Sequence, residues 1–162
     1  MSHRSLIVVA SKYGCTEKSA FLLQSRLGGA EVVNLRYGKV PDLAAYDTVI
    51  LGGSIYYGRI RKDMAVFTAQ YKQELLRKRL GLFICAGMTG KKGEEELKQA
   101  YPDIIYNKAI AKEIIGDEIY PDRISILDKC VLRMVKGKGP KTGGGLSMDK
   151  LERFAQTMSA GE

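Results

Sequence analysis

The sequence predicts an α/β protein whose parallel, doubly wound sheet carries helices on both faces. Three short runs, Ser5–Ala10, Thr48–Leu51 and Leu80–Ala86, are almost wholly apolar, as is typical of strands buried on both faces of a parallel sheet. Between these runs apolar residues recur at helical spacing, so strands and helices alternate along the chain. This alternation favours crossover connections that place helices on both faces of one sheet.

The first half of the chain continues this alternation. After the first strand, Glu17–Leu27 has an apolar stripe and ends at two glycines, which predicts a helix. A short strand, Glu31–Leu35, and a brief helical turn, Ala44–Tyr46, precede the second buried strand. A helix is expected over Arg61–Arg77, because its apolar residues share one face. These residues are Met64, Phe67, Tyr71 and Leu75.

The second half adds shorter elements. Glu94–Tyr101 predicts a helix closed by Pro102, and Ala109–Ile115 predicts a strand near a sheet edge, because charged residues interrupt it. Ser125–Lys136 and Asp149–Met158 have helical patterns, and a Gly/Lys-rich loop lies between them. No internal repeat or domain boundary is visible, so residues 1–162 are expected to form one domain.

Composition limits the function classes. The 26 Lys and Arg residues against 18 Asp and Glu give a formal net charge of +8, which favours anionic partners. Nucleic acid is not expected, because the chain lacks a zinc finger, an RNP motif and a basic helix with interleaved aromatics. The three cysteines are far apart without a C-x-x-C pair, so neither a metal site nor a disulfide framework is expected. No transmembrane run or signal peptide is recognised, which leads us to expect a cytoplasmic protein.

The stretch Ser11–Thr16 is the strongest candidate for a binding site. It joins a buried strand to a helix, and it holds a glycine and three hydroxyl side chains. Unpaired N–H groups and the macrodipole at a helix N-terminus favour an anion. Neither a G-x-x-x-x-G-K-[ST] loop nor a G-x-G-x-x-G fingerprint is present. The stretch is therefore interpreted as a phosphate-binding loop, with an ordinary strand–helix link capped by Thr16 as the alternative.

Two later stretches follow buried strands at the same expected sheet edge. Gly53–Arg59 holds two tyrosines between glycines, and Gly87–Gly93 is rich in glycine and lysine. A flat cofactor ring needs an aromatic or apolar wall and close backbone groups, which glycines permit. In an open α/β sheet, ligands bind outside the carboxyl ends of the strands.

The pattern [ST]-x-x-G-x-T after a strand resembles the FMN phosphate loop of flavodoxins. The resemblance implies a flavodoxin-like fold with five parallel strands in the order 2-1-3-4-5 and FMN as cofactor. The resemblance implies that the phosphate is bound by Ser11, Lys12, Tyr13, Gly14, Cys15 and Thr16, with Lys12 and Cys15 acting through backbone N–H groups. It assigns the ring to Ser54, Ile55, Tyr56, Tyr57 and Gly58, and to a third loop of Ala86, Gly87, Met88, Thr89 and Gly90. That third loop lacks the acidic and aromatic residues of ordinary flavodoxins.

Within the flavodoxin-like proteins, Gly-Ser-Ile-Tyr-Tyr-Gly-Arg-Ile before an amphipathic helix resembles the menaquinone-dependent protoporphyrinogen oxidase family. The similarity extends to an insertion at about residues 117–146 that carries an extra amphipathic helix. The resemblance implies a quinone-linked oxidoreductase acting on protoporphyrinogen IX in haem synthesis. The alternative is a flavodoxin-type electron carrier that docks on a partner protein; a regulatory or storage flavin protein is a third class.

Charge bears on these alternatives. Arg59, Lys91 and Lys92, if near the ring, favour the anionic reduced flavin and two-electron chemistry. No acid–base pair is recognised, so the catalytic chemistry is assigned to FMN and no catalytic residue is named. The predicted helix Ser125–Lys136 has an apolar stripe, and residues 129–141 contain no acid. The stripe is open to three interpretations: packing on its own domain, on a dimer mate, or on an anionic membrane surface through residues 125–141.

Overall fold

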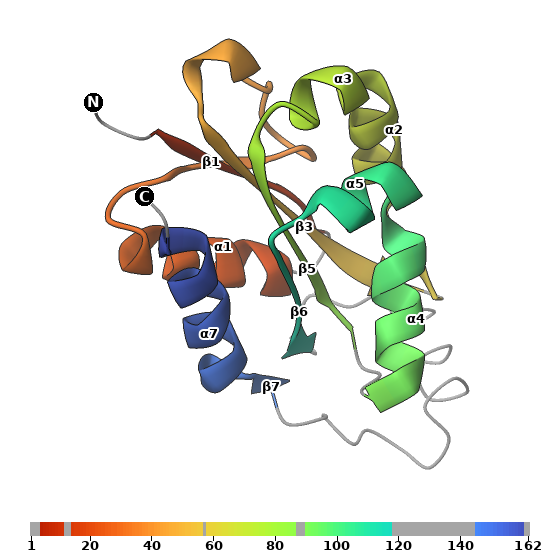
Figure 1. Ribbon diagram of the computed structural model, residues 1–162. Coiled ribbons are helices and arrows are strands. Elements are labelled where there is room, and N and C mark those ends of the chain that lie inside the picture. The colour runs from red at the N-terminus through yellow and green to blue at the C-terminus, as the bar shows by residue number, and fades with distance from the viewer. Residues whose placement is uncertain (1–3, 12–13, 57, 87–89, 118–144, 161–162) are drawn as a thin grey trace.

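The computed structural model describes residues 4–11, 14–56, 58–86, 90–117 and 145–160 (Figure 1). Five strands are parallel: β1 (Ser5–Ala10), β2 (Glu31–Asn34), β3 (Thr48–Tyr56), β5 (Arg79–Cys85) and β6 (Ala111–Asp117). Their order is β2-β1-β3-β5-β6, which confirms the predicted 2-1-3-4-5 arrangement. Two short strands, β4 (Arg59–Ile60) and β7 (Gly145–Leu146), add antiparallel to β3 and β6.

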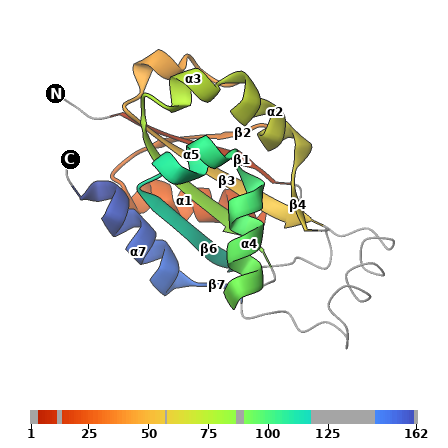
Figure 2. The ribbon, with the colours of Figure 1, turned by 45° about the vertical axis from the view of Figure 1, so that its right-hand side comes forward.

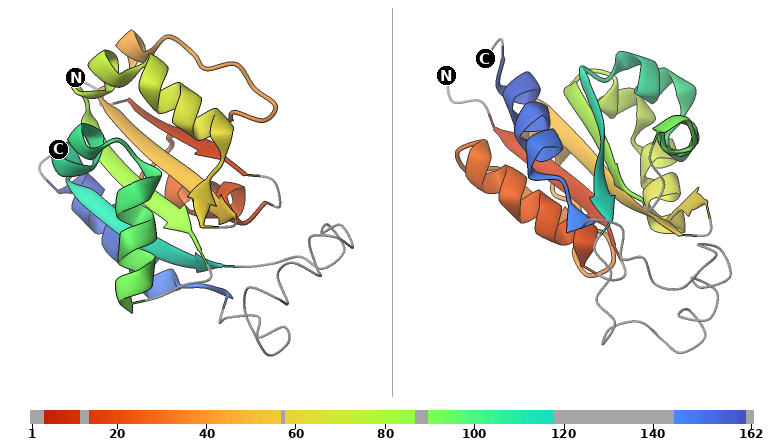
Figure 3. Two further views of the ribbon diagram at one scale, coloured as in Figure 1. Left: turned by 90° about the vertical axis from the view of Figure 1, so that its right-hand side faces the viewer. Right: turned by 90° about the horizontal axis from the view of Figure 1, so that it is seen from below.

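Helices cover both faces of this sheet (Figures 1 and 3). The helices α1 (Cys15–Arg26) and α7 (Met148–Ser159) pack on one face, over Ile7, Ile50 and Phe83. The other face carries α2 (Lys62–Gln70), α3 (Lys72–Leu75), α4 (Gly90–Ala100) and α5 (Asp103–Lys108), with the short 3₁₀ helix η1 (Leu43–Ala45). The strands are apolar on both faces for this reason, since each face lies under helices.

Close packing explains two glycines of β3. A Cβ on Gly52 would lie 2.1 Å from Cζ of Phe83, whose buried ring meets Phe154 of α7 edge to face. A Cβ on Gly53 would lie 2.5 Å from Cδ1 of Ile60. Side chains from opposite faces therefore occupy the space that these two positions leave open.

Several expected elements differ from the observed ones. The helix expected over Arg61–Arg77 is interrupted at Tyr71, which separates α2 from α3. The helix expected from Glu94 begins at Gly90, so Lys91 and Lys92 belong to its first turn and not to a loop. The strand expected to end at Leu51 continues to Tyr56, because a hairpin with β4 extends it. The sequence analysis missed β4, α5 and β7, which are short and lack a periodic pattern.

Other expectations are confirmed or lie beyond the described residues. β6 lies near an edge, since within the part of the chain that the structure describes it pairs on its outer side only with the two residues of β7. The predicted helix Ser125–Lys136 and nearly all of the 117–146 insertion fall outside the described residues. Among the described residues no helix is long and apolar enough to cross a membrane.

Glu96 of α4 makes the stability of this fold sensitive to pH. Its side chain is buried, and Oε2 has no hydrogen-bond partner among the described residues. Burial raises the pKa of the Glu96 carboxyl, and Lys92 partly opposes this shift. Because the folded state binds this proton more tightly than the unfolded state, stability is lost as pH rises from the ordinary Glu pKa through the raised one.

We expect Glu96→Gln to remove this loss. The free energy of unfolding of the wild type should fall relative to that of the variant as pH rises through that window. Urea unfolding at a series of pH values measures the difference. Glu95→Gln, at an exposed position of the same helix, is the matched control. If the free energies of unfolding of the wild type and of Glu96→Gln change with pH in parallel, Glu96 is not the source of the pH dependence.

Candidate functional site

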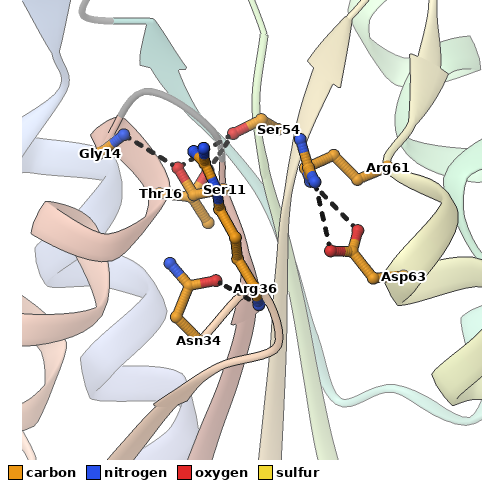
Figure 4. A network of polar contacts seen from close by, with 8 residues as sticks. All are labelled: Ser11, Gly14, Thr16, Asn34, Arg36, Ser54, Arg61 and Asp63. Atoms are coloured by element: carbon orange, nitrogen blue, oxygen red, sulfur yellow. Dashed lines mark hydrogen bonds and ion pairs between the residues drawn. The ribbon is translucent and has the colours of Figure 1, made fainter. Parts of the chain in front are cut away.

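Three hydroxyl side chains meet at the carboxyl edge of the sheet. Thr16 Oγ1 lies 2.7 Å from Ser54 Oγ, and Ser54 Oγ lies 3.5 Å from Ser11 Oγ (Figure 4). Ser11 and Thr16 are almost completely buried. The sheet register causes the meeting, since Ala10 of β1 pairs with Gly53 of β3 and places Ser11 beside Ser54. Residues 38 positions apart in the sequence therefore form one polar cluster.

The N-terminus of α1 lies against this cluster. Gly14 has φ 88°, a left-handed conformation that favours glycine, and its N–H donates to Ser11 Oγ at 3.1 Å. Gly14 is the N-cap residue, and no side chain caps the helix. Thr16 is therefore not the cap that the alternative of an ordinary link assumed, because it lies inside the first turn. The helix offers its N-terminal dipole, and the cluster offers hydroxyl groups, to an anion.

Arg36 is a residue that the sequence analysis missed. It follows β2, and Figure 4 shows its side chain directed toward Ser11 and Thr16. The buried Asn34 fixes this turn, because its Oδ1 accepts from the Arg36 backbone N–H at 3.1 Å. The Asn34 amide also donates to Glu17 Oε2 at 2.8 Å, so the one carboxylate of the first turn of α1 is engaged on the β2 side. Only the strand order indicates that Arg36 lies near the first loop, because β2 lies beside β1 and ends at the same edge of the sheet.

The second predicted stretch forms a hairpin in place of a loop. Ser54, Ile55 and Tyr56 lie on β3, and Gly58, with φ 75°, joins β3 to β4. Figure 2 shows β4 at the tip of β3, just before the chain enters α2. Ile55 is half-buried against the core under α2. Tyr57 and the side chain of Tyr56 lie outside the described residues, as do Lys12 and Tyr13 of the first stretch.

The third predicted stretch is described only at its ends. Ala86 is buried, and its N–H donates to the Gly116 carbonyl at 3.0 Å; Gly90 is exposed and begins α4 with φ 64°. Gly87, Met88 and Thr89 fall outside the described residues. This stretch follows β5, so its described ends lie at the same sheet edge as the hydroxyl cluster.

The side chain of Cys15, a predicted site residue, belongs to the core together with Cys85. Cys15 and Cys85 are buried in the cluster of side chains under α1 and α7. Ser19 lies close to both, since its Oγ donates to the Cys15 carbonyl at 3.0 Å and lies 3.6 Å from Cys85 Sγ. Among the described residues no group of three or more His, Cys, Asp or Glu side chains is arranged to hold a metal ion.

The donor set suits a phosphate monoester. It combines an uncapped helix N-terminus, buried hydroxyl groups and the Arg36 side chain directed toward them, and the Glu17 carboxylate of the first turn of α1 accepts from Asn34. These groups stabilise a dianion by charge-assisted hydrogen bonds. This fold and this donor set are those with which a doubly wound α/β protein can bind a phosphate-bearing ligand at the carboxyl edge of its sheet.

The chain belongs to the flavodoxin family, because the family model of the flavodoxin domain matches residues 6–154. FMN, the cofactor that the sequence predicts, is the cofactor of this family. The chain is therefore a flavodoxin-like redox protein, of a kind that typically passes electrons to partner proteins.

Solved structures share the fold at low sequence identity. A short-chain flavodoxin associated with a PDU bacterial microcompartment has 15% identity and a TM-score of 0.62, with 97% of each chain covered. The two-electron reduced flavodoxin of Megasphaera elsdenii has 19% identity and a TM-score of 0.57, over 95% of this chain and 97% of that one. A flavoprotein from Lactobacillus acidophilus in complex with FMN has 16% identity and a TM-score of 0.53, over 72% and 94%. No curated protein sequence matches the chain.

Proposed function

We propose that this chain is an FMN-dependent oxidoreductase that takes an electron pair from a reduced organic substrate and delivers it to a quinone. The observation that supports this proposal most is the basic character of the site. Arg36 points to the hydroxyl cluster, while Arg59 lies on the hairpin side of it, in a chain of net charge +8. Positive charge stabilises the anionic reduced flavin and favours a two-electron step.

The described residues divide the binding of FMN into two tasks. Ser11, Thr16 and Ser54 would hold the phosphate with their hydroxyl groups, while the first N–H groups of α1 and the Arg36 guanidinium neutralise its charge. The hairpin residues 54–58 and the segment 86–90 would line the ring from two neighbouring strand ends. The bound flavin supplies the exchange of a hydride equivalent, and the chain supplies position and electrostatic stabilisation.

The substrate in this proposal is protoporphyrinogen IX, because the second stretch and the insertion resemble menaquinone-dependent protoporphyrinogen oxidases. Its carboxylates would be attracted by a protein of net charge +8. The expected setting is the cytoplasm, as a single domain of residues 1–162. Contact with the inner face of a membrane through residues 125–141, or a homodimer through the same segment, belongs to the proposal as well.

A second candidate is an electron carrier with no small-molecule substrate. This candidate is supported by the structural match to a short-chain flavodoxin, which covers 97% of this chain and 97% of that one. Its partner would present acidic groups, because a protein of this charge is steered away from basic docking surfaces. The two candidates differ in whether an organic substrate is turned over.

One paired measurement separates them. Reductive titration of the yellow protein is expected to pass from the oxidised to the fully reduced spectrum without a long-wavelength band of a one-electron form. Protoporphyrinogen is expected to become fluorescent porphyrin faster with protein and a menaquinone analogue together than with either alone. A persistent long-wavelength band without quinone-dependent porphyrin formation would establish the electron carrier in its place. Release of FAD in place of FMN on denaturation would overturn both candidates.

A further inference from the structure

A cavity of about 920 Å³ lies beside the hydroxyl cluster, between α2, the β3–β4 hairpin and the segment that follows β2. Its volume is within the range of roughly 300–1,000 Å³ that is typical of small-molecule sites. Of the predicted FMN residues that the structure describes, only Ser54 lines it; Ser11, Gly14 and Thr16 do not. The cavity is therefore adjacent to the phosphate site, and a different set of residues forms it.

The interior of this cavity is apolar and aromatic. Leu35 and Val40 line it from the segment after β2, and Ile60 lines it from β4. Phe67 of α2 and Tyr71, which follows α2, also line it, with ring centroids 4.9 Å apart and planes inclined by 38°. Apolar and aromatic walls of this kind stabilise a flat, apolar body by burial and by ring contacts.

The remaining lining residues give the cavity a positive charge. Lys39, Arg59, Arg61 and Lys62 line it, and Asp63 is the only acid among the described lining residues. Asp63 is already engaged, because Arg61 donates to both of its oxygens, at 3.1 and 3.3 Å. The charge of Arg61 is thereby balanced, and Lys39, Arg59 and Lys62 give the cavity an excess of positive charge.

We propose that this cavity binds an organic anion with a flat apolar body, such as an aromatic carboxylate or sulfonate, next to the FMN site. The aromatic pair receives the body, and the lysine and arginine side chains receive the anionic group. An inorganic anion lacks the body, and a neutral aromatic molecule lacks the charge, so neither uses both parts of the cavity. The proposal requires no redox step and does not rest on the quinone-linked activity.

The test compares two probes that share the same rings, 8-anilinonaphthalene-1-sulfonate and the uncharged N-phenyl-1-naphthylamine. Isothermal titration of the full, FMN-loaded chain measures both. We expect the sulfonate to bind at one site more tightly than the neutral probe, and we expect its affinity to fall with added salt. The double variant Lys39→Gln and Lys62→Gln should weaken sulfonate binding about tenfold and leave the neutral probe unchanged. Val66→Glu, at a half-exposed lining position, should weaken the sulfonate as well.

The matched control removes the same charge elsewhere. Arg77→Gln with Lys98→Gln changes two exposed cations that do not line the cavity, and it should leave both probes unchanged. Equal affinity of the two probes, or an equal loss in both double variants, would overturn the proposal. Retained FMN absorbance shows that each variant is folded. If the sulfonate does not bind but quinone-dependent turnover is intact, the cavity proposal alone is overturned. If the sulfonate binds as expected but there is no quinone-dependent turnover, the proposed function alone is overturned.

Discussion

Thr16→Glu is expected to abolish the retention of FMN during purification. Thr16 is fully buried, and its hydroxyl lies 2.7 Å from Ser54 Oγ, at the N-terminus of α1. A carboxylate there would carry its negative charge into the place where the helix and Arg36 favour a phosphate. Repulsion and bulk act in the same direction, so the variant should be colourless and should take up no FMN in equilibrium titration.

A variant that preserves the shape of the side chain distinguishes loss of FMN binding from loss of the fold. Thr16→Val keeps the volume and removes the hydroxyl, which costs a charge-assisted hydrogen bond of about 1.5–3 kcal/mol. We therefore expect FMN binding to weaken by roughly tenfold to a hundredfold. Thr68→Val is the matched control, because Thr68 is equally buried in α2 and donates only to backbone carbonyls of its own helix. Tight binding of FMN by Thr16→Val would show that the phosphate lies elsewhere.

Gly52→Ala is expected to destabilise the fold strongly. The new Cβ would lie 2.1 Å from Cζ of Phe83, and this fully buried ring cannot move freely because Phe154 of α7 packs against it. Overpacking of this kind costs typically 1–3 kcal/mol. At the upper end of that range, Tm should fall by roughly 6–12 °C in a protein of this size. Thermal unfolding followed by circular dichroism measures the shift.

Two further variants test the cause of this loss. Gly38→Ala is the matched control, because its Cβ would meet only ordinary contacts at 3.6 Å, and Tm should stay close to that of the wild type. Adding Phe83→Leu to Gly52→Ala should restore part of the stability, because the shorter side chain leaves room for the methyl group. An unchanged Tm in Gly52→Ala, or no coupling between the two substitutions, would show that the contact with Phe83 is not the constraint.

The sequence predicted the elements whose causes are local. The apolar runs at Ser5–Ala10 and Leu80–Ala86 are strands because they are apolar on both faces, and their ends agree with β1 and β5 to within one residue. Short elements were missed because their causes are not local. β4 and β7 hold two residues each, so their pairing depends on distant partners and leaves no periodic pattern. The interruption at Tyr71 was missed because the apolar face of α2 and α3 continues across it.

What the sequence determined by itself is the doubly wound sheet, because it follows from the order and burial of neighbouring residues; the phosphate-binding role of the loop after its first strand stays a prediction. Only the tertiary structure decided which distant groups complete the site. The parallel register of β1 and β3 brings Ser54 to Thr16. The position of β2 beside β1 directs Arg36 toward the same cluster, and the hairpin and α2 line the basic cavity. These contacts join residues far apart in the chain, and the pairing and order of the parallel strands bring them together.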